Sequence, residues 1–357
     1  MKIGIDIRST LKKTRTGIGN YTLDLVSSLA KIDSLNDYCL YGRKKLIDLK
    51  RKAFKLPGPN FRYIMDYLNR GPYKIFKDLD VFHTSSYDLK RPKGARFFVT
   101  VHDVINKAYP EGHDTKTLKE IDEKLKYTLS EADTLIADSL NTKKDLIRFY
   151  DVEGSRIKVI YPGIDKRFSS MDTEPGNKKD YILFVGTIEP RKNIKNLIKA
   201  FELLKKEHSI KEKLYIVGMK GWMYEDVFKE YEGSEFKKDI VFKGRVDHDE
   251  LIKLYKEALL FVYPSFYEGF GFPVIEAFLS GTAVVTSKTS SCGEIAGDSA
   301  MLIDPYDHKD IAKGMFSLIH DEALREKMII KGKERARAFD WADTAKEFLG
   351  LFSEGRV

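Results

Sequence analysis

Glu268-Gly-Phe-Gly-Phe-Pro-Val-Ile-Glu276 follows closely on the apolar run Ala258-Leu-Leu-Phe-Val-Tyr-Pro264. The apolar run has the length of a buried strand. The glycines free the backbone behind it to approach a ligand closely, and Pro273 fits the first turn of a helix. The segment therefore predicts a strand, a glycine loop and a helix. The loop amides and the positive helix end would face an anion between the two glutamates.

This predicted geometry suits a nucleotide-sugar. The diphosphate would lie on the amides, while one carboxylate binds hydroxyls of the sugar and the other binds the ribose hydroxyls. A carboxylate fits both tasks because the ionised group only accepts hydrogen bonds. A purely structural interpretation is also open, in which one glutamate caps the helix and the other is solvated.

Strand-like and helix-like stretches alternate along the chain, which predicts parallel sheets covered by helices. Strands are expected at 2–7, 38–41, 81–83, 97–100, 134–137 and 158–160, and again at 181–186, 214–217, 240–242, 260–263, 283–286 and 301–303. The polar stretch 161–180 contains Gly and Pro and is typical of a linker. We therefore expect two doubly wound domains, residues 1–165 and 166–340, with a cleft between them as the ligand site.

The composition of the 357 residues is that of a folded globular protein. Hydrophobic residues make up 42% and aromatic residues 12%, which excludes a disordered chain. No apolar run is long enough to span a membrane, and the chain starts directly with an expected strand, so we expect no signal peptide. The two cysteines, Cys39 and Cys292, are too few for a disulfide framework, which makes the cytoplasm the expected compartment.

The net charge of +8 is concentrated in the first half of the chain. Residues 1–165 carry 31 Lys and Arg against 22 Asp and Glu, or +9, and the rest carries 31 against 32, or −1. Much of the excess lies in residues 43–55, which read either as a solvated surface helix or as a peripheral contact with anionic lipid at the inner membrane face. A nucleic-acid partner is not expected, because no aromatic-interleaved basic platform accompanies the charge.

Several motifs in a fixed order resemble the retaining glycosyltransferases of family 4. They are Thr16-Gly-Ile-Gly-Asn-Tyr21, Val101-His-Asp103, Val159-Ile-Tyr-Pro-Gly-Ile-Asp165, Gly186-Thr-Ile-Glu-Pro-Arg-Lys-Asn193, Val217-Gly, Phe242-Lys-Gly-Arg245 and the glutamate pair. The resemblance implies the α/β GT-B fold, with two facing Rossmann-like domains and a C-terminal helix, 341–357, that returns to the first domain. The motifs look most like those of bacterial mannosyltransferases that build O-antigen or capsular polysaccharide.

The resemblance assigns roles to residues of the second half. Glu268 corresponds to the glutamate that binds hydroxyls of the donor sugar, and Glu276 to the one that binds the ribose. Lys192 corresponds to the lysine that neutralises the leaving diphosphate. The backbone amides that would hold the sugar and the diphosphate belong to Phe270, Gly271 and Phe272.

The chain departs from the family pattern beside Gly186. Many members place an arginine directly after this glycine, whereas this chain has Thr187, and Arg191 is the candidate that supplies the missing charge. Arg245 is expected either to border the nucleotide or to pair with an acid in a turn. For Lys192 and Arg191 the alternative is a basic helix start without a ligand, which the helix dipole disfavours.

Residues of the first half complete the expected site. The loop Gly17, Ile18 and Gly19 would bring backbone amides towards the diphosphate, although any turn from a strand to a helix can require glycine. His102 resembles the histidine that contacts the donor sugar. Asp103 either holds the acceptor hydroxyl or orients the loop.

No metal and no cofactor are expected. The Asp-x-Asp pairs at 78–80 and 247–249 are typical of turns, and a helix cap at Asp247 explains the second pair. Lys192, Arg191 and the helix-end amides would take the place of a divalent cation at the diphosphate.

These expectations combine into a retaining hexosyltransferase that uses a nucleoside-diphosphate sugar, with GDP-mannose favoured and UDP-hexoses second. The acceptor would be a glycan or a lipid-linked oligosaccharide. Two other interpretations stay open: a GT-B sugar epimerase, which would act without an acceptor, and a nucleotide-binding scaffold, which would bind without turnover.

Overall fold

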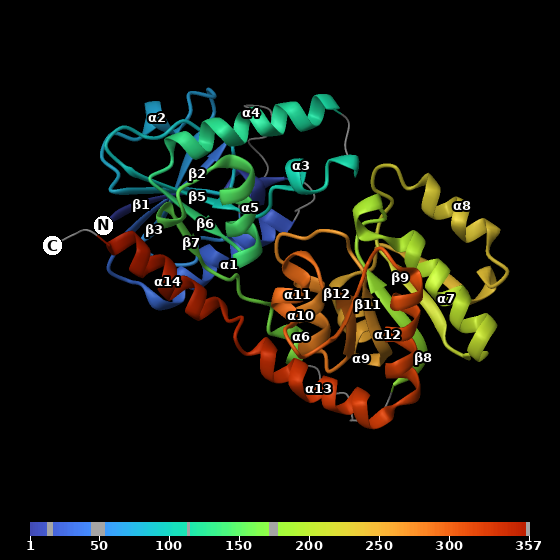
Figure 1. Ribbon diagram of the computed structural model, residues 1–357. Coiled ribbons are helices and arrows are strands. Elements are labelled where there is room, and N and C mark those ends of the chain that lie inside the picture. Colours follow the sequence, from blue (N-terminus) through green and yellow to red (C-terminus); the bar gives the residue numbers. More distant parts are fainter. Residues whose placement is uncertain (13–16, 44–53, 113–114, 171–177, 355–357) are drawn as a thin grey trace. The chain divides into compact units, whose positions relative to one another are not determined.

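The computed structural model describes residues 1–12, 17–43, 54–112, 115–170 and 178–354. The chain divides into two compact units (Figure 1). The first unit comprises Met1–Asn106, His113–Gly163 and Phe339–Val357, and the second comprises Lys107–Gly112 and Ile164–Ala338. The last stretch of the chain therefore belongs with the first half of the sequence.

The first unit is built on a parallel sheet with the strand order β3-β2-β1-β4-β5-β6-β7. Its strands are β1 Lys2–Asp6, β2 Asp37–Arg43, β3 Phe61–Asp66, β4 Val81–Thr84, β5 Arg96–Val101, β6 Thr134–Ala137 and β7 Ile157–Val159. Six of them confirm expected strands. β3 was not expected. It is an edge strand whose apolar run, Tyr63–Met65, is only three residues long and stands between Arg62 and Asp66.

Helices cover both faces of this sheet (Figure 1). They are α1 Gly17–Ile32, α2 Pro72–Ile75, α4 Thr115–Glu131, α5 Leu140–Tyr150 and α14 Trp341–Ser353, with the short α3 Ile105–Ala108 at the border of the unit. Ser139 caps α5, since its hydroxyl accepts a hydrogen bond from the Thr142 N–H at 3.0 Å.

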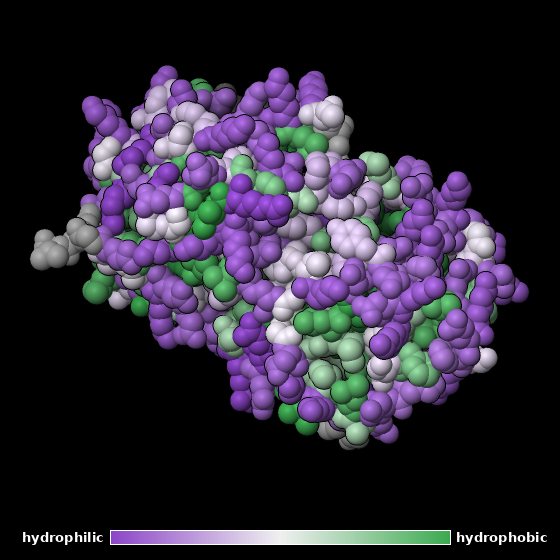
Figure 2. Space-filling model, viewed as in Figure 1, coloured by the Kyte–Doolittle hydropathy of each residue, from purple (hydrophilic) through white to green (hydrophobic). Residues whose placement is uncertain are grey.

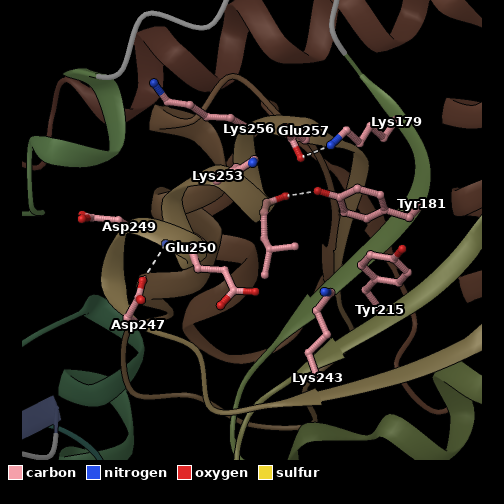
Figure 3. A pocket seen from close by; sticks show the side chains of 11 residues that line it. Lys179, Tyr181, Tyr215, Lys243, Asp247, Asp249, Glu250, Lys253, Lys256 and Glu257 are labelled. Atoms are coloured by element: carbon pink, nitrogen blue, oxygen red, sulfur yellow. Dashed lines mark hydrogen bonds and ion pairs between the residues drawn. The ribbon is translucent and has the colours of Figure 1, made fainter.

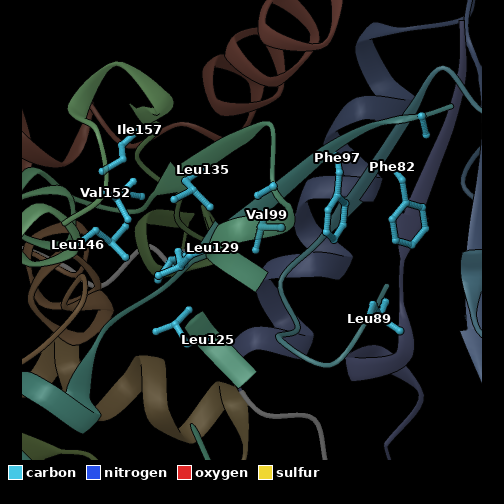
Figure 4. Close-up of a cluster of buried hydrophobic side chains, with 14 of the residues drawn as sticks. Phe82, Leu89, Phe97, Val99, Leu125, Leu129, Leu135, Leu146, Val152 and Ile157 are labelled. Carbon is cyan, nitrogen blue, oxygen red and sulfur yellow. The ribbon is translucent and has the colours of Figure 1, made fainter. Parts of the chain in front are cut away.

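Successive strand residues feed two separate hydrophobic cores, because side chains alternate between the faces of a sheet. Phe82 and Phe97 belong to one core, which α4 and α5 complete with Leu125, Leu129 and Leu146 (Figure 4). The neighbouring residues Val81 and Phe98 belong to the other core, which α1 and α14 cover.

Helix α14 is an integral part of the first unit. Phe348 and Phe352 are fully buried, and both rings lie edge-on or tilted against His83 of β4. The segment that leads into this helix packs tightly on the end of the first half, where a Cβ added to Gly163 would lie 2.2 Å from the Trp341 backbone nitrogen. Gly163 is therefore required for α14 to dock.

The second unit repeats the architecture with the strand order β10-β9-β8-β11-β12-β13, again all parallel. The strands are β8 Lys179–Val185, β9 Lys213–Val217, β10 Ile240–Gly244, β11 Ala258–Tyr263, β12 Ala283–Ser287 and β13 Met301–Ile303, and each confirms an expected strand. The helices are α6 Arg167–Ser170, α7 Ile194–His208, α8 Glu225–Gly233, α9 His248–Glu257, α10 Phe272–Leu279, α11 Ser290–Ala296, α12 His308–His320 and α13 Glu322–Ala336.

The strand order of each sheet reverses direction at one point, between β1 and β4 in the first unit and between β8 and β11 in the second. Helices leave such neighbouring strands to opposite faces, which opens a crevice at their carboxyl ends. Most candidate residues of the second half follow β8 or β11, so the topology gathers them at this reversal. Arg245 is the exception, because it follows β10.

Polar side chains cover most of the face shown in Figure 2, and apolar side chains form scattered patches between them. Among the described residues, no helix is both long and apolar enough to cross a membrane. Most of the basic stretch expected to contact lipid, 43–55, lies outside the described residues.

Gly163→Ala should destabilise the protein by about 1–3 kcal/mol, because the added methyl group forces α14 away from its seat. Gly350→Ala, within α14 itself, is the matched control. Its Cβ meets nothing within 4 Å, and replacing an exposed helical glycine should stabilise by about 0.5–1 kcal/mol. Urea denaturation of both variants tests this, and equal effects would contradict the docking role of Gly163.

Candidate functional site

The loops that follow β8, β11 and β13 are tied together at the carboxyl edge of the second sheet. Asn193 adopts a left-handed backbone conformation with φ of 58° between the 3-10 turn Pro190–Lys192 and α7. Its side-chain amide donates to the backbone oxygens of Pro264, at 2.9 Å, and Pro305, at 2.6 Å. This bridge fixes the Arg191–Lys192 turn against the segment that leads to Glu268.

The loop after β8 also requires a glycine in the loop after the neighbouring strand, β9. Gly218, directly after β9, has φ of +153°, and a Cβ at this position would lie 1.9 Å from the Gly186 carbonyl oxygen. The Gly186 N–H donates to the Val217 oxygen at 2.9 Å, which extends the sheet past the formal strand ends. The backbone of the Gly186 loop is thus held against β9.

Two cations converge on the carboxylate of Glu268. The Lys192 ammonium lies 2.6 Å from Oε1, and the Arg191 guanidinium lies 2.6 Å from Oε2. All three side chains are almost buried, with 10% to 14% of each side chain exposed. Each oxygen of the carboxylate therefore has its own cation in a region that water barely reaches, where such hydrogen bonds are strongest.

Neutral hydroxyls complete the shell around Glu268. Tyr263 and Ser265 donate to Oε1 at 2.9 Å and 2.7 Å, and Tyr263 also accepts from the Lys192 ammonium at 2.6 Å. Burial by itself raises the pKa of Glu268. The charges of Arg191 and Lys192 and the hydrogen bonds outweigh it and lower the pKa to about 2, so the carboxylate is ionised at any physiological pH.

A second carboxylate balances the cluster. Glu189 is 2% exposed, and its Oε1 accepts from the Arg191 guanidinium at 2.7 Å. Burial raises the pKa of Glu189, while the charges of Arg191 and Lys192 oppose this shift. Sequence reasoning missed Glu189 as a partner of Arg191, because the 3-10 turn Pro190–Lys192 that brings the two side chains together was not expected.

Glu276 lies one turn into α10, away from those cations, and is bound by a neutral group instead. Its Oε2 accepts from the Tyr255 hydroxyl at 2.8 Å. Burial raises the pKa of Glu276 to about 7, against the opposing hydrogen bond from Tyr255. The two glutamates of the motif therefore have opposite electrostatic settings, one strongly ionised and one half protonated near neutral pH.

The glycine loop between the two glutamates is confirmed as the start of α10. Gly271 has φ of +108°, a conformation that disfavours any other residue, and Phe272 begins the helix with Pro273 in its first turn. The rings of Phe270 and Phe272 meet edge to face at 4.9 Å. Cys292 is a fully buried thiol beside this loop, and its Sγ would lie 3.7 Å from a Cβ at Gly271.

Thr187 and Arg245 lie at the same edge of the sheet but outside the cluster around Glu268. Thr187 is exposed, and a Cβ on Gly221 would lie 2.6 Å from its methyl group. Arg245 is exposed after β10, which β9 separates from β8. Arg191, whose direction the sequence left open, points at Glu268.

The candidates of the first unit gather at the carboxyl edge of its own sheet. Gly17, Ile18 and Gly19 form the first turn of α1, and a Cβ on Gly17 would meet nothing within 4 Å. Tyr21, in the next turn, lies edge to face with His102 at a ring distance of 4.8 Å. His102 directly follows β5, so the start of α1 and the end of β5 are neighbours.

His102 has a partner that sequence reasoning missed. Its Nδ1 lies 2.5 Å from Oδ2 of Asp138, which is 2% exposed and directly follows β6. Burial lowers the pKa of His102, but the charge of Asp138 and its hydrogen bond outweigh this and raise it. The sequence showed a polar residue after each of these two strands, but only the sheet shows that β5 and β6 are parallel neighbours.

The remaining acidic candidates have local partners. Asp103 accepts from the Ile105 N–H at 3.2 Å, which favours a role in orienting the loop. Asp247 caps α9 by accepting from the Glu250 N–H at 2.8 Å, as expected, and Asp80 accepts from the Lys2 N–H at 2.7 Å. In the parts of the chain that the structure describes, no three His, Cys, Asp or Glu residues lie together as metal ligands would.

A separate hollow of about 910 Å³ lies between α9 and the face formed by β8, β9 and β10. Lys243, Glu250 and Lys253 extend into the same space, and the Tyr181 hydroxyl donates to the Leu254 oxygen at 2.8 Å (Figure 3). Both basic and acidic side chains line it. None of the Glu268 cluster lines this hollow, so the two are distinct.

Two doubly wound units, with a buried charge cluster at the strand reversal of the second, define a glycosyltransferase of the GT-B fold. Solved structures share this fold over nearly the whole chain. Sucrose-phosphate synthase from Thermosynechococcus elongatus has a TM-score of 0.79 at 20% identity, with 99% of this chain and 98% of that chain covered. HepE from Anabaena has a TM-score of 0.75 at 16% identity, with 99% of both chains covered.

Two family models account for most of the sequence. Residues 15–168 match the model described as Glycosyltransferase Family 4, and residues 165–335 match the one described as Glycosyl transferases group 1. The O-antigen chain mannosyltransferase B of Escherichia coli is 27% identical over 96% of this chain and 97% of its own length. The chain belongs to the family 4 glycosyltransferases and resembles the O-antigen mannosyltransferases.

Asp138→Asn should lower the pKa of His102, because the asparagine carries no charge to stabilise the imidazolium. In the unaltered protein this pKa lies above the ordinary value of about 6.5. Protonated His102 therefore contributes stability below that value, and the contribution is lost as the pH rises through the folded pKa. Titration of the imidazole protons by NMR measures the shift.

His83 serves as the internal control for that titration, since burial lowers its pKa to about 3 and it should stay neutral in both proteins. An unchanged His102 pKa in the Asp138→Asn variant would show that the carboxylate does not control the imidazole.

Proposed function

We propose that this protein transfers a hexose, with retention of configuration, from a nucleoside-diphosphate sugar to a glycan or lipid-linked acceptor during surface polysaccharide synthesis. GDP-mannose is the proposed donor. The observation that carries the proposal is the cluster in which Lys192 and Arg191 surround Glu268 at the carboxyl edge of the second sheet. It combines two cations suited to a diphosphate with a carboxylate suited to sugar hydroxyls.

The proposed reaction needs mainly electrostatic help. The bond between the sugar's anomeric carbon and the phosphate oxygen breaks, and a bond to the acceptor oxygen forms on the same face. The acceptor's proton passes to the departing phosphate. Lys192 and Arg191 would stabilise the negative charge that grows on that phosphate, which is the largest contribution a preorganised site can make.

We propose that Arg191 supplies the charge of the arginine that is missing at Thr187, and the position of its guanidinium supports this. Its guanidinium is anchored by Glu189 on one side and contacts Glu268 on the other, so it lies beside Lys192. Thr187 is exposed and carries no charge. Two adjacent cations in one turn would thus supply the charge that related enzymes draw from two separate positions.

Glu276 is proposed to bind the ribose hydroxyls. It lies partly buried on α10, where the Tyr255 hydroxyl donates to Oε2, and its other oxygen is the proposed acceptor for a ribose hydroxyl. In the first unit, His102 is proposed to contact the donor sugar through Nε2, a buried atom with no partner among the described residues. Gly17, Ile18 and Gly19 would offer the amides of the first turn of α1 to the diphosphate.

The choice of mannose and of a polysaccharide acceptor follows the relatives. One relative is named an O-antigen chain mannosyltransferase, and a second, from Salmonella typhimurium, carries the name O-antigen chain mannosyltransferase RfbU and is 31% identical over 59% of this chain and 57% of its own length. The structure of HepE holds UDP and glucose, which keeps a UDP-hexose as the second candidate donor.

Thermal stabilisation by nucleotides tests the donor. A ligand that binds the folded state raises the melting temperature, so GDP-mannose should raise it more than UDP-glucose or ADP-glucose do, also in the presence of EDTA. Lys192→Ala and Glu276→Ala should abolish the shift. A shift with UDP-glucose alone would make UDP-glucose the donor in place of GDP-mannose. No shift with any of these nucleotide sugars would overturn the proposed function.

The pH dependence of binding tests Glu276. Because burial places its pKa at about 7, the carboxylate must lose its proton to accept both ribose hydroxyls. Affinity for the donor should therefore increase about tenfold from pH 6 to pH 8, because the ionised fraction of a carboxyl group with this pKa rises about tenfold over that range. Calorimetric titration should show this rise for the unaltered protein and a flat profile for Glu276→Gln.

A further inference from the structure

We infer that Glu268 makes the site discriminate between a nucleoside-diphosphate sugar and the bare nucleoside diphosphate. In the ligand-free structure this carboxylate holds the two cations that the proposed function assigns to the diphosphate. It thus acts as an internal anion that any incoming diphosphate must displace. The inference rests on the proposed function of the same site.

Most hydrogen-bond donors of Lys192 and Arg191 are already used within the ligand-free cluster. Lys192 donates to Glu268 and to the Tyr263 hydroxyl, and Arg191 donates to Glu268, to Glu189 and to the Tyr267 backbone oxygen at 2.9 Å. Two cations face two carboxylates, so the cluster is neutral. A diphosphate that takes these cations as its main partners draws Lys192 and Arg191 away from Glu268.

Displaced from its cations, Glu268 needs new donors, because an ionised carboxylate buried without partners is strongly unfavourable. Tyr263 and Ser265 satisfy only Oε1, and Oε2 has Arg191 as its cation. A hexose attached to the diphosphate supplies hydroxyl donors to the vacated oxygen. A bare nucleoside diphosphate supplies none, and its charge adds to that of Glu268.

The partner of the two cations is expected to change during turnover. While the sugar is attached, its hydroxyls stabilise Glu268 and the cations are free for the phosphate. Once the sugar has left, Glu268 competes again for Lys192 and Arg191 and displaces the product. Glu268 therefore sets the relative affinity for donor and product, a role beyond holding the sugar.

Calorimetric titration with GDP and with GDP-mannose tests the inference, first on the unaltered protein. GDP-mannose should bind about tenfold or more tightly than GDP, a difference of about 1.4 kcal/mol, although GDP carries the greater negative charge. Equal binding, or tighter binding of GDP, would overturn the inference without any variant having to fold.

Glu268→Gln then assigns the effect to the carboxylate. The amide keeps the shape but has no charge to hold the cations, so affinity for GDP should rise about tenfold while affinity for GDP-mannose does not rise. Glu276→Gln is the matched control on the same helix and loop. It removes a ribose contact that both ligands share, so it should weaken both by the same factor.

The outcomes separate this inference from the proposed function. If neither GDP nor GDP-mannose, nor the corresponding uridine pair, binds the unaltered protein, the proposed function fails. If the donor binds but Glu268→Gln weakens GDP or leaves its affinity unchanged, only the inference fails. The melting temperature of the ligand-free variant, measured alongside, shows whether it is folded, and GDP should raise it further than in the unaltered protein.

Discussion

The contact on which the second unit depends is the buried pairing of Glu268 with Lys192 and Arg191. A carboxylate with 10% of its side chain exposed is tolerable only because each oxygen has a cation, and the cations in turn are fixed by the loops that carry them. Asn193 ties the Arg191–Lys192 turn to the β11 and β13 loops. The charge cluster and the loop backbone therefore depend on each other, so a substitution in one is expected to disturb the other.

Sheet topology explains why these residues meet at all. Lys192 and Glu268 are far apart in the sequence but follow β8 and β11, which pair side by side where the strand order reverses. The first unit uses the same principle with β5 and β6, whose ends bring His102 and Asp138 together. In each unit the candidate site residues lie at the carboxyl ends of parallel strands, where side chains need not fill a core.

Much of this arrangement could be predicted from the sequence, because short apolar runs and glycine turns mark parallel strands directly. Each strand that the structure describes was expected except β3, whose apolar run at the sheet edge is only three residues long between Arg62 and Asp66. The glutamate pair, Lys192 and His102 were recognised from their motifs. Their partners were not recognised. Glu189 lies inside a quoted motif but was given no role, and Asp138 reaches His102 only because β5 and β6 are neighbours in the sheet. The opposite pKa shifts of Glu268 and Glu276 likewise depend on burial and neighbours, which the spacing of two identical residues does not encode.

The central claim is that the cations now bound to Glu268 serve the diphosphate of a sugar donor. A crystal structure of this chain with GDP-mannose, in the absence of an acceptor, tests it most directly. The account predicts that Lys192 and Arg191 contact phosphate oxygens while Glu268 accepts hydrogen bonds from the hexose. A complex in which both ion pairs to Glu268 stay intact, with the diphosphate held elsewhere, would contradict it.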